Sequence, residues 1–149
     1  MVRQINDAGL SLIKSFEGFR DTAYQDQGGI WTIGYGHTAD VTEGMTCTME
    51  DASNWLSADL TNAESGVSRI VTVNLGDNQF AALVSFAFNV GLGNFANSSL
   101  VRLLNGGSYD CVPTQLCRWD HVNGAPNAGL FRRRVAEGQL WSTPDDGNA

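Results

Sequence analysis

The chain has 149 residues, 42% of them apolar, a size that fits one globular domain able to bury its own core. Nine basic and sixteen acidic side chains give a net charge of -7, which argues against nucleic acid as a partner, because phosphate binding needs clustered cations. No stretch has the pattern of a membrane span or a signal peptide, so we expect no membrane insertion.

The cysteines and histidines give no sign of a metal site. Cys47, Cys111 and Cys117 have no metal-ligand spacing, and their odd number argues against a disulfide framework. Cys111 and Cys117 could close a short loop, but the simpler expectation is three reduced thiols. His37 and His121 come without an HExxH motif or a carboxylate cluster, so we predict no bound metal.

The first helix is predicted to begin after Asn6, an N-cap residue, and to end at about Glu17, before Gly18. Leu10 and Ile13 lie on one apolar stripe, and the same stripe reaches Glu17. Partial burial near the negative end of the helix dipole would favour the protonated form of this carboxyl group, as a general acid requires. The alternative is an ordinary solvated residue of the last turn.

A β-hairpin is predicted next, with residues 21–25 as its first strand, 26–29 as its turn and 30–35 as the returning strand. Asp26 then lies at the edge of the turn. The side chain of Thr32 belongs to one face of the returning strand, because strand side chains alternate between faces. The hairpin therefore brings a carboxylate and a hydroxyl group into one region.

Helical patterns fill the rest of the chain. Thr48 and Asp51 are typical of a capping box, which opens one long helix through Ile70. Asp77 is predicted to cap a helix that is apolar nearly all round as far as Val90. Further helices are predicted from Ser98 or Ser99 to Leu104, from Pro113 to Trp119 and from Leu130 to Trp141.

This order of elements predicts an α+β fold. We expect two lobes, residues 1–70 and 71–141, joined by the long helix and followed by a flexible tail at residues 142–149. The arginines at residues 132–134 are either a solvated charge run or a grip for an anionic or polar ligand.

These motifs resemble the phage-type lysozymes, or endolysins, which are glycoside hydrolases that cut bacterial peptidoglycan. The resemblance rests on EGFRDTAYQDQGGIWTIGYGHT, on the apolar stretch around residues 80–91, and on RWDHVNG and GLFRRRVAE, all in the order of that family. It implies a mostly helical, lysozyme-like α+β fold in one catalytic domain, with peptidoglycan as the partner. It also implies a monomer without a metal or organic cofactor.

The resemblance implies hydrolysis of the β-1,4 bond between N-acetylmuramic acid and N-acetylglucosamine, and so lysis of the host cell. Glu17 would be the catalytic acid, Asp26 the carboxylate that activates or orients water, and Thr32 the hydroxyl that holds this water. One protonated and one ionised carboxyl group, on opposite faces of the sugar, are what such hydrolysis needs. Within the family, Thr32 implies inversion at the sugar carbon.

Further roles follow from the same resemblance. His37 and Asp59 would form a structural ion pair between the hairpin and the long helix. Asn89 would contact an acetamido sugar. Substrate contacts are expected from Tyr35, Phe88, Asn89 and Arg133, although Phe88 is equally well explained as a core residue.

Two other functions are consistent with parts of the pattern. A lytic transglycosylase acts on the same substrate with one glutamate, so Asp26 and Thr32 argue against it. A non-catalytic wall-binding module would have no need of the intact trio. Because the sequence shows no signal peptide or signal anchor, we expect the protein to wait in the host cytoplasm and to reach the periplasm and cell wall through a separate membrane pore.

Overall fold

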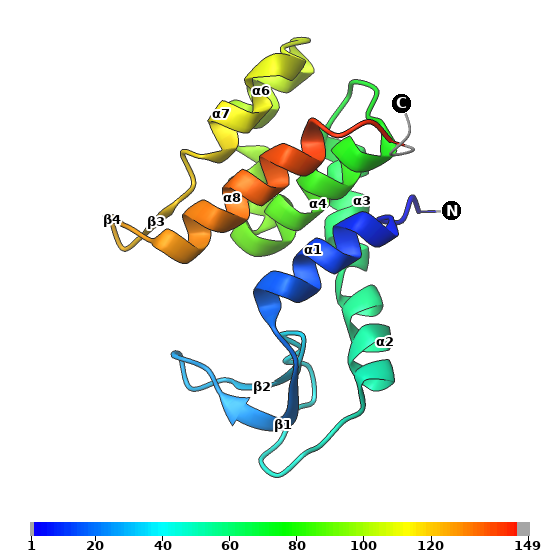
Figure 1. Ribbon diagram of the computed structural model, residues 1–149, viewed down its shortest axis with the longest axis vertical. Coiled ribbons are helices and arrows are strands. Elements are labelled where there is room, and N and C mark those ends of the chain that lie inside the picture. Colours follow the sequence, from blue (N-terminus) through cyan, green and yellow to red (C-terminus); the bar gives the residue numbers. More distant parts are fainter. Residues whose placement is uncertain (1, 146–149) are drawn as a thin grey trace. The chain divides into compact units, whose positions relative to one another are not determined.

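The computed structural model describes residues 2–145 (Figure 1). These residues form two compact units, one of residues 13–61, which we call the hairpin unit, and one of the remaining described residues, which we call the helical unit. The elements are, in chain order, α1 (Asp7–Glu17), β1 (Arg20–Gln25), β2 (Trp31–Gly34), α2 (Met49–Asp59), α3 (Thr61–Ile70), α4 (Asp77–Val90), α5 (Leu92–Ala96), α6 (Ser99–Asn105), the 3-10 helix η1 (Tyr109–Cys111), α7 (Val112–Leu116), β3 (His121–Val122), β4 (Ala125–Pro126) and α8 (Ala128–Trp141).

The division into units differs from the lobes predicted at residues 1–70 and 71–141. The beginning of the chain and nearly all of α3 belong to the helical unit. A buried hydrogen bond explains this, because the Ile5 N–H donates to Glu64 Oε2 at 2.7 Å and so ties the N-terminal segment to α3. A contact of this kind, between residues far apart in the chain, has no signature in the sequence.

Helix α1 begins and ends where the sequence predicted. Asn6 Oδ1 accepts a hydrogen bond from the Gly9 N–H at 2.9 Å and so caps the first turn. At the other end, Gly18 has a φ of 72°, and its N–H donates to the Lys14 carbonyl at 2.9 Å. That left-handed conformation suits glycine and ends the helix, which leaves Glu17 as its last residue.

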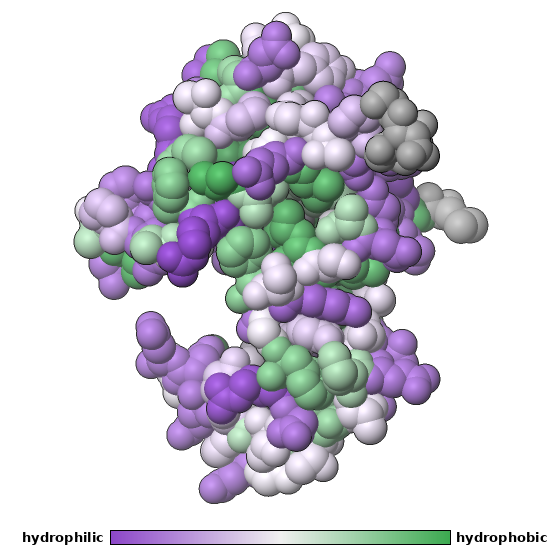
Figure 2. All heavy atoms as spheres, in the orientation of Figure 1, coloured by the Kyte–Doolittle hydropathy of each residue, from purple (hydrophilic) through white to green (hydrophobic). Residues whose placement is uncertain are grey.

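The predicted hairpin is present as an antiparallel pair of strands, β1 and β2. Tyr24 lies opposite Thr32 in the register, and the Asp26 N–H donates to the Ile30 carbonyl at 2.9 Å to close the turn. At the lower left of the view, Figure 2 shows mostly hydrophilic residues at the tip of this hairpin, and residues 25–30 are exposed. The hairpin therefore presents its turn to solvent.

The long helix predicted from Thr48 to Ile70 is two helices in the structure. Its start is confirmed: Thr48 Oγ1 accepts from the Asp51 N–H at 3.0 Å, and Asp51 Oδ2 accepts from the Thr48 N–H at 3.1 Å. The break lies at Leu60, which is fully buried and has a ψ of -13°, away from the α-helical value of about -42°. Leu60 is the C-cap residue of α2, and α3 begins at the next residue, Thr61.

Helix α4 forms the core of the helical unit, and α8 packs along it (Figure 1). The expectation of a helix buried on nearly every side is confirmed, since every residue from Phe80 to Ala87 is buried. Gly76, not Asp77, is the N-cap residue, and its N–H donates to Gln79 Oε1 at 2.9 Å. The short helix α5 was not predicted, because Gly91 is typical of a stop and here also begins the next turn.

The end of the described chain is bound to the helical unit, contrary to the frayed tail that was predicted. Asn78 Nδ2 donates to the carbonyls of Thr143 and Pro144 at 3.1 and 3.0 Å, and Asp145 Oδ1 accepts from the Asn78 N–H at 3.0 Å. The remainder of the predicted tail, residues 146–149, lies outside the described residues.

Two further expectations concern the cysteines and the membrane. Cys47, Cys111 and Cys117 are free thiols. This agrees with the expectation of three reduced thiols, and the alternative of a loop closed between Cys111 and Cys117 is not formed. Within residues 2–145, no helix is long and apolar enough to cross a bilayer.

Glu64 makes the stability of the fold depend on pH. Its side chain is buried, and burial raises the pKa of its carboxyl group above the ordinary value of 4.5, against the lowering effect of the Ile5 N–H. The folded state therefore holds this proton more tightly than the unfolded state. The resulting stability is complete below pH 4.5 and is lost as the pH rises through the pKa of the folded protein.

We expect Glu64→Gln to remove this dependence, because the amide oxygen still accepts from the Ile5 N–H and carries no charge. Thermal unfolding of the variant and the wild type between pH 4 and pH 8 measures the pH dependence of stability. The Tm of the variant minus that of the wild type should increase as the pH rises. Since both proteins retain every other titrating group, a difference in Tm that stays constant over this range would contradict the assignment.

Candidate active site

Glu17 lies at the end of α1, half-buried, within the hairpin unit. The backbone of Gly36 approaches its carboxyl group so closely that a Cβ atom at residue 36 would lie 3.0 Å from Glu17 Oε1. Gly36 also has a φ of 81°, a conformation that favours glycine. The glycine that follows Tyr35 therefore gives the Glu17 carboxyl group its place beside the loop after β2.

Asp26 has one anchored and one available carboxylate oxygen. Its Oδ1 accepts hydrogen bonds from the N–H groups of Gly28 and Ile30, at 2.8 and 2.9 Å. Within residues 2–145, its Oδ2 accepts no hydrogen bond from the protein, and the residue is exposed. The turn thus fixes the direction of the carboxylate and leaves one oxygen for water or a ligand.

Thr32 is tied to the same residue of the turn. Its Oγ1 donates to the Ile30 carbonyl at 3.0 Å, and the side chain is buried. A hydroxyl group that has used its proton still offers lone pairs as acceptors. The backbone of Ile30 therefore holds both side chains, Asp26 through its N–H and Thr32 through its carbonyl.

The predicted partners His37 and Asp59 lie in contact within the hairpin unit. His37 Nδ1 is 2.8 Å from Asp59 Oδ2, and the imidazole ring stacks on Trp55 with centroids 4.8 Å apart. Both partner residues of His37 belong to α2. The contact therefore links the loop after β2 to α2, as a structural pair would.

Tyr35 was expected to contact the substrate, but in the structure it is buried. The side chain is buried, its ring centroid lies 5.6 Å from that of Phe19, and Lys14 Nζ lies 5.3 Å from the ring. Only 6% of the Tyr35 surface is exposed. Tyr35 is thus a core residue of this unit.

The other predicted substrate contacts belong to the helical unit. Phe88 is half-buried and Asn89 is exposed, both in the last turn of α4. Asn89 Oδ1 accepts a hydrogen bond from Arg134 Nη2 at 2.5 Å. The amide is therefore held by α8 while it remains exposed to solvent.

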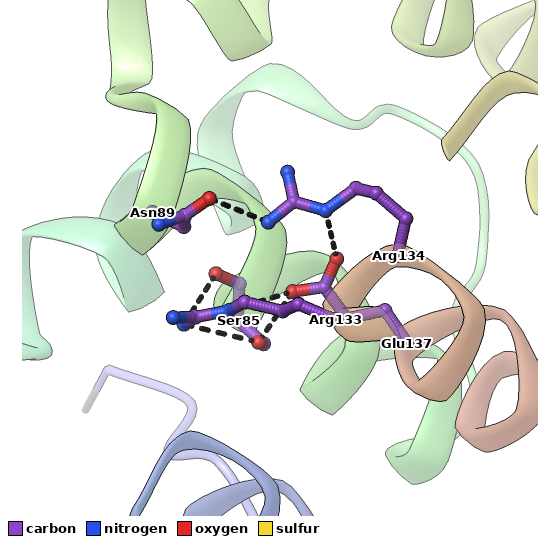
Figure 3. Close-up of polar contacts among 5 residues, drawn as sticks. All are labelled: Ser85, Asn89, Arg133, Arg134 and Glu137. Atoms are coloured by element: carbon purple, nitrogen blue, oxygen red, sulfur yellow. Dashed lines mark hydrogen bonds and ion pairs between the residues drawn. The ribbon is translucent and has the colours of Figure 1, made fainter. Parts of the chain in front are cut away.

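The arginine run at residues 132–134 is not a solvated charge run, because two of its members, shown in Figure 3, are buried. Arg132 is exposed, but Arg133 and Arg134 are buried beside Glu137, which is 0% exposed. Glu137 was not among the residues predicted from the sequence. The spacing of three and four residues between these arginines and the glutamate on one helix was the signal that could have revealed it.

Glu137 is the centre of this buried network. Its Oε2 accepts from Ser85 Oγ at 2.6 Å and from Arg133 Nε at 3.4 Å. Its Oε1 lies 2.9 Å from Arg134 Nε as an ion pair, without the angle of a hydrogen bond. Burial raises the pKa of Glu137 and lowers that of Arg134, and their mutual attraction opposes both shifts. Hydrogen bonds between the charged side chains of α8 and residues Ser85 and Asn89 of α4 therefore join the two helices, in addition to apolar packing.

The described residues offer no site for a metal ion. Among residues 2–145, there is no group of three or more histidine, cysteine, aspartate or glutamate side chains that could hold one.

The fold and the site define a class of protein. A mostly helical α+β chain, in which a glutamate ends the first helix and an aspartate and a threonine follow on a small hairpin, has the architecture of the lysozymes. The family model described as Phage lysozyme matches residues 14–137. The chain belongs to this family, and the resemblance seen in the sequence is confirmed.

The chain is also similar to individual proteins named endolysin or muramidase. An endolysin of Acyrthosiphon pisum secondary endosymbiont phage 1 is 38% identical over 93% of this chain and 98% of its own length. An endolysin of Bacillus phage PZA is 41% identical over 94% of this chain, which spans only 55% of that protein. The muramidase domain of SpmX from Asticaccaulis excentricus has a TM-score of 0.90 and 42% identity, over 95% of this chain and 99% of that domain. The chain is therefore a lysozyme-type glycoside hydrolase.

Proposed function

We propose that the protein is a muramidase-type endolysin that hydrolyses the β-1,4 bond between N-acetylmuramic acid and N-acetylglucosamine in bacterial peptidoglycan, and so lyses the host cell. Membership of the Phage lysozyme family and similarity to proteins named endolysin and muramidase support this reaction. The proposed chemistry needs neither a metal nor an organic cofactor, because two carboxyl groups and a water molecule are sufficient for it.

In this proposal Glu17 is the general acid, which gives its proton to the oxygen of the leaving sugar. A proton donor in the transition state contributes about 100- to 10,000-fold in rate. The close approach of Gly36 to Glu17 Oε1 supports the assignment, because it restricts where the carboxyl group can lie. The bond between carbon and the leaving oxygen breaks as this proton arrives.

The observation that carries the proposal is the double attachment of Asp26 and Thr32 to Ile30. Both side chains then offer acceptors, Asp26 through Oδ2 and Thr32 through the lone pairs of Oγ1. A water molecule that donates its two hydrogens to these acceptors would direct a lone pair at the sugar carbon. Asp26 takes the proton as the water attacks, so the product is inverted.

Product analysis on purified peptidoglycan tests the reaction. We expect reducing ends with the configuration at the sugar carbon inverted, measured by NMR at early times and by mass spectrometry. Products with 1,6-anhydro ends would identify a lytic transglycosylase instead. Binding of peptidoglycan without any product would identify a wall-binding module.

Thr32→Val tests the water site with a side chain of nearly the same shape. We expect a loss in kcat of about tenfold or more, the equivalent of one hydrogen bond in the transition state, or about 1.4 kcal/mol. Thr32→Ser is the matched control, because it keeps the hydroxyl group and should keep most of the activity. Equal rates for the valine variant and the wild type would show that Thr32 does not hold the attacking water.

Substrate contacts in the helical unit are proposed for Phe88, Asn89 and Arg133. Phe88 and Asn89 share the last turn of α4, and Asn89 is exposed there. Arg133 is buried, and its Nη2 donates to the Ser85 carbonyl at 3.4 Å. The His37 and Asp59 pair is proposed as structural support for the hairpin.

A further inference from the structure

The structure fixes the orientation of the Asn89 amide, which is one of the predicted sugar contacts. An asparagine amide has an acceptor end and a donor end, which are similar in shape. A guanidinium group donates hydrogen bonds and accepts none, so the end that faces Arg134 has to be the oxygen. The 2.5 Å contact between Arg134 Nη2 and Asn89 Oδ1 thus determines which end of the amide is left for a ligand.

Arg134 is itself held firmly. Its side chain is 0% exposed, its Nε lies 2.9 Å from Glu137 Oε1, and its guanidinium carbon lies 4.9 Å from the centroid of the Phe86 ring. Glu137 is fixed in turn by Ser85 Oγ at 2.6 Å. An arginine with a buried counter-ion and an aromatic ring beside it has little freedom to turn. It is a rigid support for a surface amide.

The donor end of Asn89 is available. Asn89 is exposed, and within residues 2–145 its Nδ2 has no hydrogen-bond partner. Figure 3 shows this nitrogen on the side of the amide that faces away from Arg134. A ligand group that approaches this end of the amide meets its two N–H donors.

We infer that Arg134 is a positioning residue that fixes the Asn89 amide, so that Nδ2 donates to the carbonyl oxygen of an N-acetyl group on the sugar. The inference rests on the proposed action on peptidoglycan, whose two sugars both carry such groups. Without Arg134 the amide could turn and present its oxygen, which would repel the carbonyl. The buried ion pair of α8 thereby contributes to the selection of N-acetylated over de-N-acetylated sugar.

The test measures a selectivity ratio. This is kcat/KM on native peptidoglycan divided by kcat/KM on peptidoglycan whose glucosamine has been chemically de-N-acetylated. Asn89→Asp keeps the acceptor for Arg134 but has no donor for the carbonyl. We expect the ratio of the two kcat/KM values to fall about tenfold, as for one lost hydrogen bond, mainly through a higher KM on native substrate. Asn62→Asp, at an exposed position of α3, is the matched control and should keep the ratio of the wild type.

The double variant R134M/E137Q tests Arg134. It removes both charges of the Arg134–Glu137 pair and leaves an amide for Ser85 and Arg133, so Arg134 does not stay behind as a buried charge without its counter-ion. We expect its selectivity ratio to fall as in Asn89→Asp. An unchanged ratio in Asn89→Asp would overturn the inference, and an unchanged ratio in a folded double variant would overturn the role of Arg134. Failure of the wild type to cleave native peptidoglycan would instead refute the proposed function.

Discussion

Glu17→Gln should abolish the clearing of permeabilised Gram-negative cells, with a loss in kcat of about 100- to 10,000-fold. The glutamine side chain has nearly the same shape but carries no proton to give to the leaving oxygen. Its amide nitrogen can still lie beside Gly36, so the hairpin unit should keep its structure. Turbidity measurements give the rate, and circular dichroism with thermal unfolding verifies the fold.

Glu43→Gln is the matched control for this experiment. It makes the same chemical change at an exposed residue of the same unit, outside the proposed site. We expect activity close to that of the wild type. If Glu17→Gln keeps more than a tenth of the wild-type rate, Glu17 is not the general acid.

Glu137→Ala should cause the largest loss of stability among the substitutions considered. Its removal would leave the buried guanidinium group of Arg134 without its counter-ion, and breaking a buried pair in this way costs about 3–5 kcal/mol. Urea denaturation at neutral pH, followed by tryptophan fluorescence, measures the free energy of unfolding.

Two comparisons sharpen this result. Asp110→Ala removes a carboxylate from an exposed position of the helical unit and should change the free energy of unfolding by about 0.5 kcal/mol or less. R134M/E137Q should be less destabilised than Glu137→Ala, since it leaves fewer buried charges without a partner. Equal stability of Glu137→Ala and the wild type would show that the network contributes nothing to the fold.

The ends of α1, the hairpin and the start of α2 could be predicted from the sequence, because each depends on residues close together in the chain. The start of α1 after Asn6 follows from the capping of its first turn, and its end before Gly18 from the left-handed conformation of the glycine. The hairpin follows from alternation and turn residues, and the capping box of Thr48 and Asp51 from its spacing. For the same reason Glu17, Asp26 and Thr32 could be selected as candidates from residue type and spacing.

The interruption between α2 and α3 and the boundary between the two units could not be predicted from local sequence patterns. The sequence favours one helix through residue 60, but the structure ends α2 at the buried residue Leu60 and begins α3 directly after it. The hydrogen bond between Ile5 and Glu64 moves the boundary between the units, because it joins segments that no local pattern connects.

The arginines at residues 132–134 show most clearly the difference between what the sequence predicts and what tertiary contacts decide. A run of three cations is usually solvated, because burial of an unpaired charge is costly. Glu137 and Ser85 supply the partners that make burial of Arg133 and Arg134 possible, and only the packing of α8 on α4 brings Ser85 there. The sequence alone therefore determined the family and the candidate chemistry, which rest on local spacing. The tertiary structure alone decided the buried ion pairs and the orientation of Asn89, which rest on contacts between distant segments.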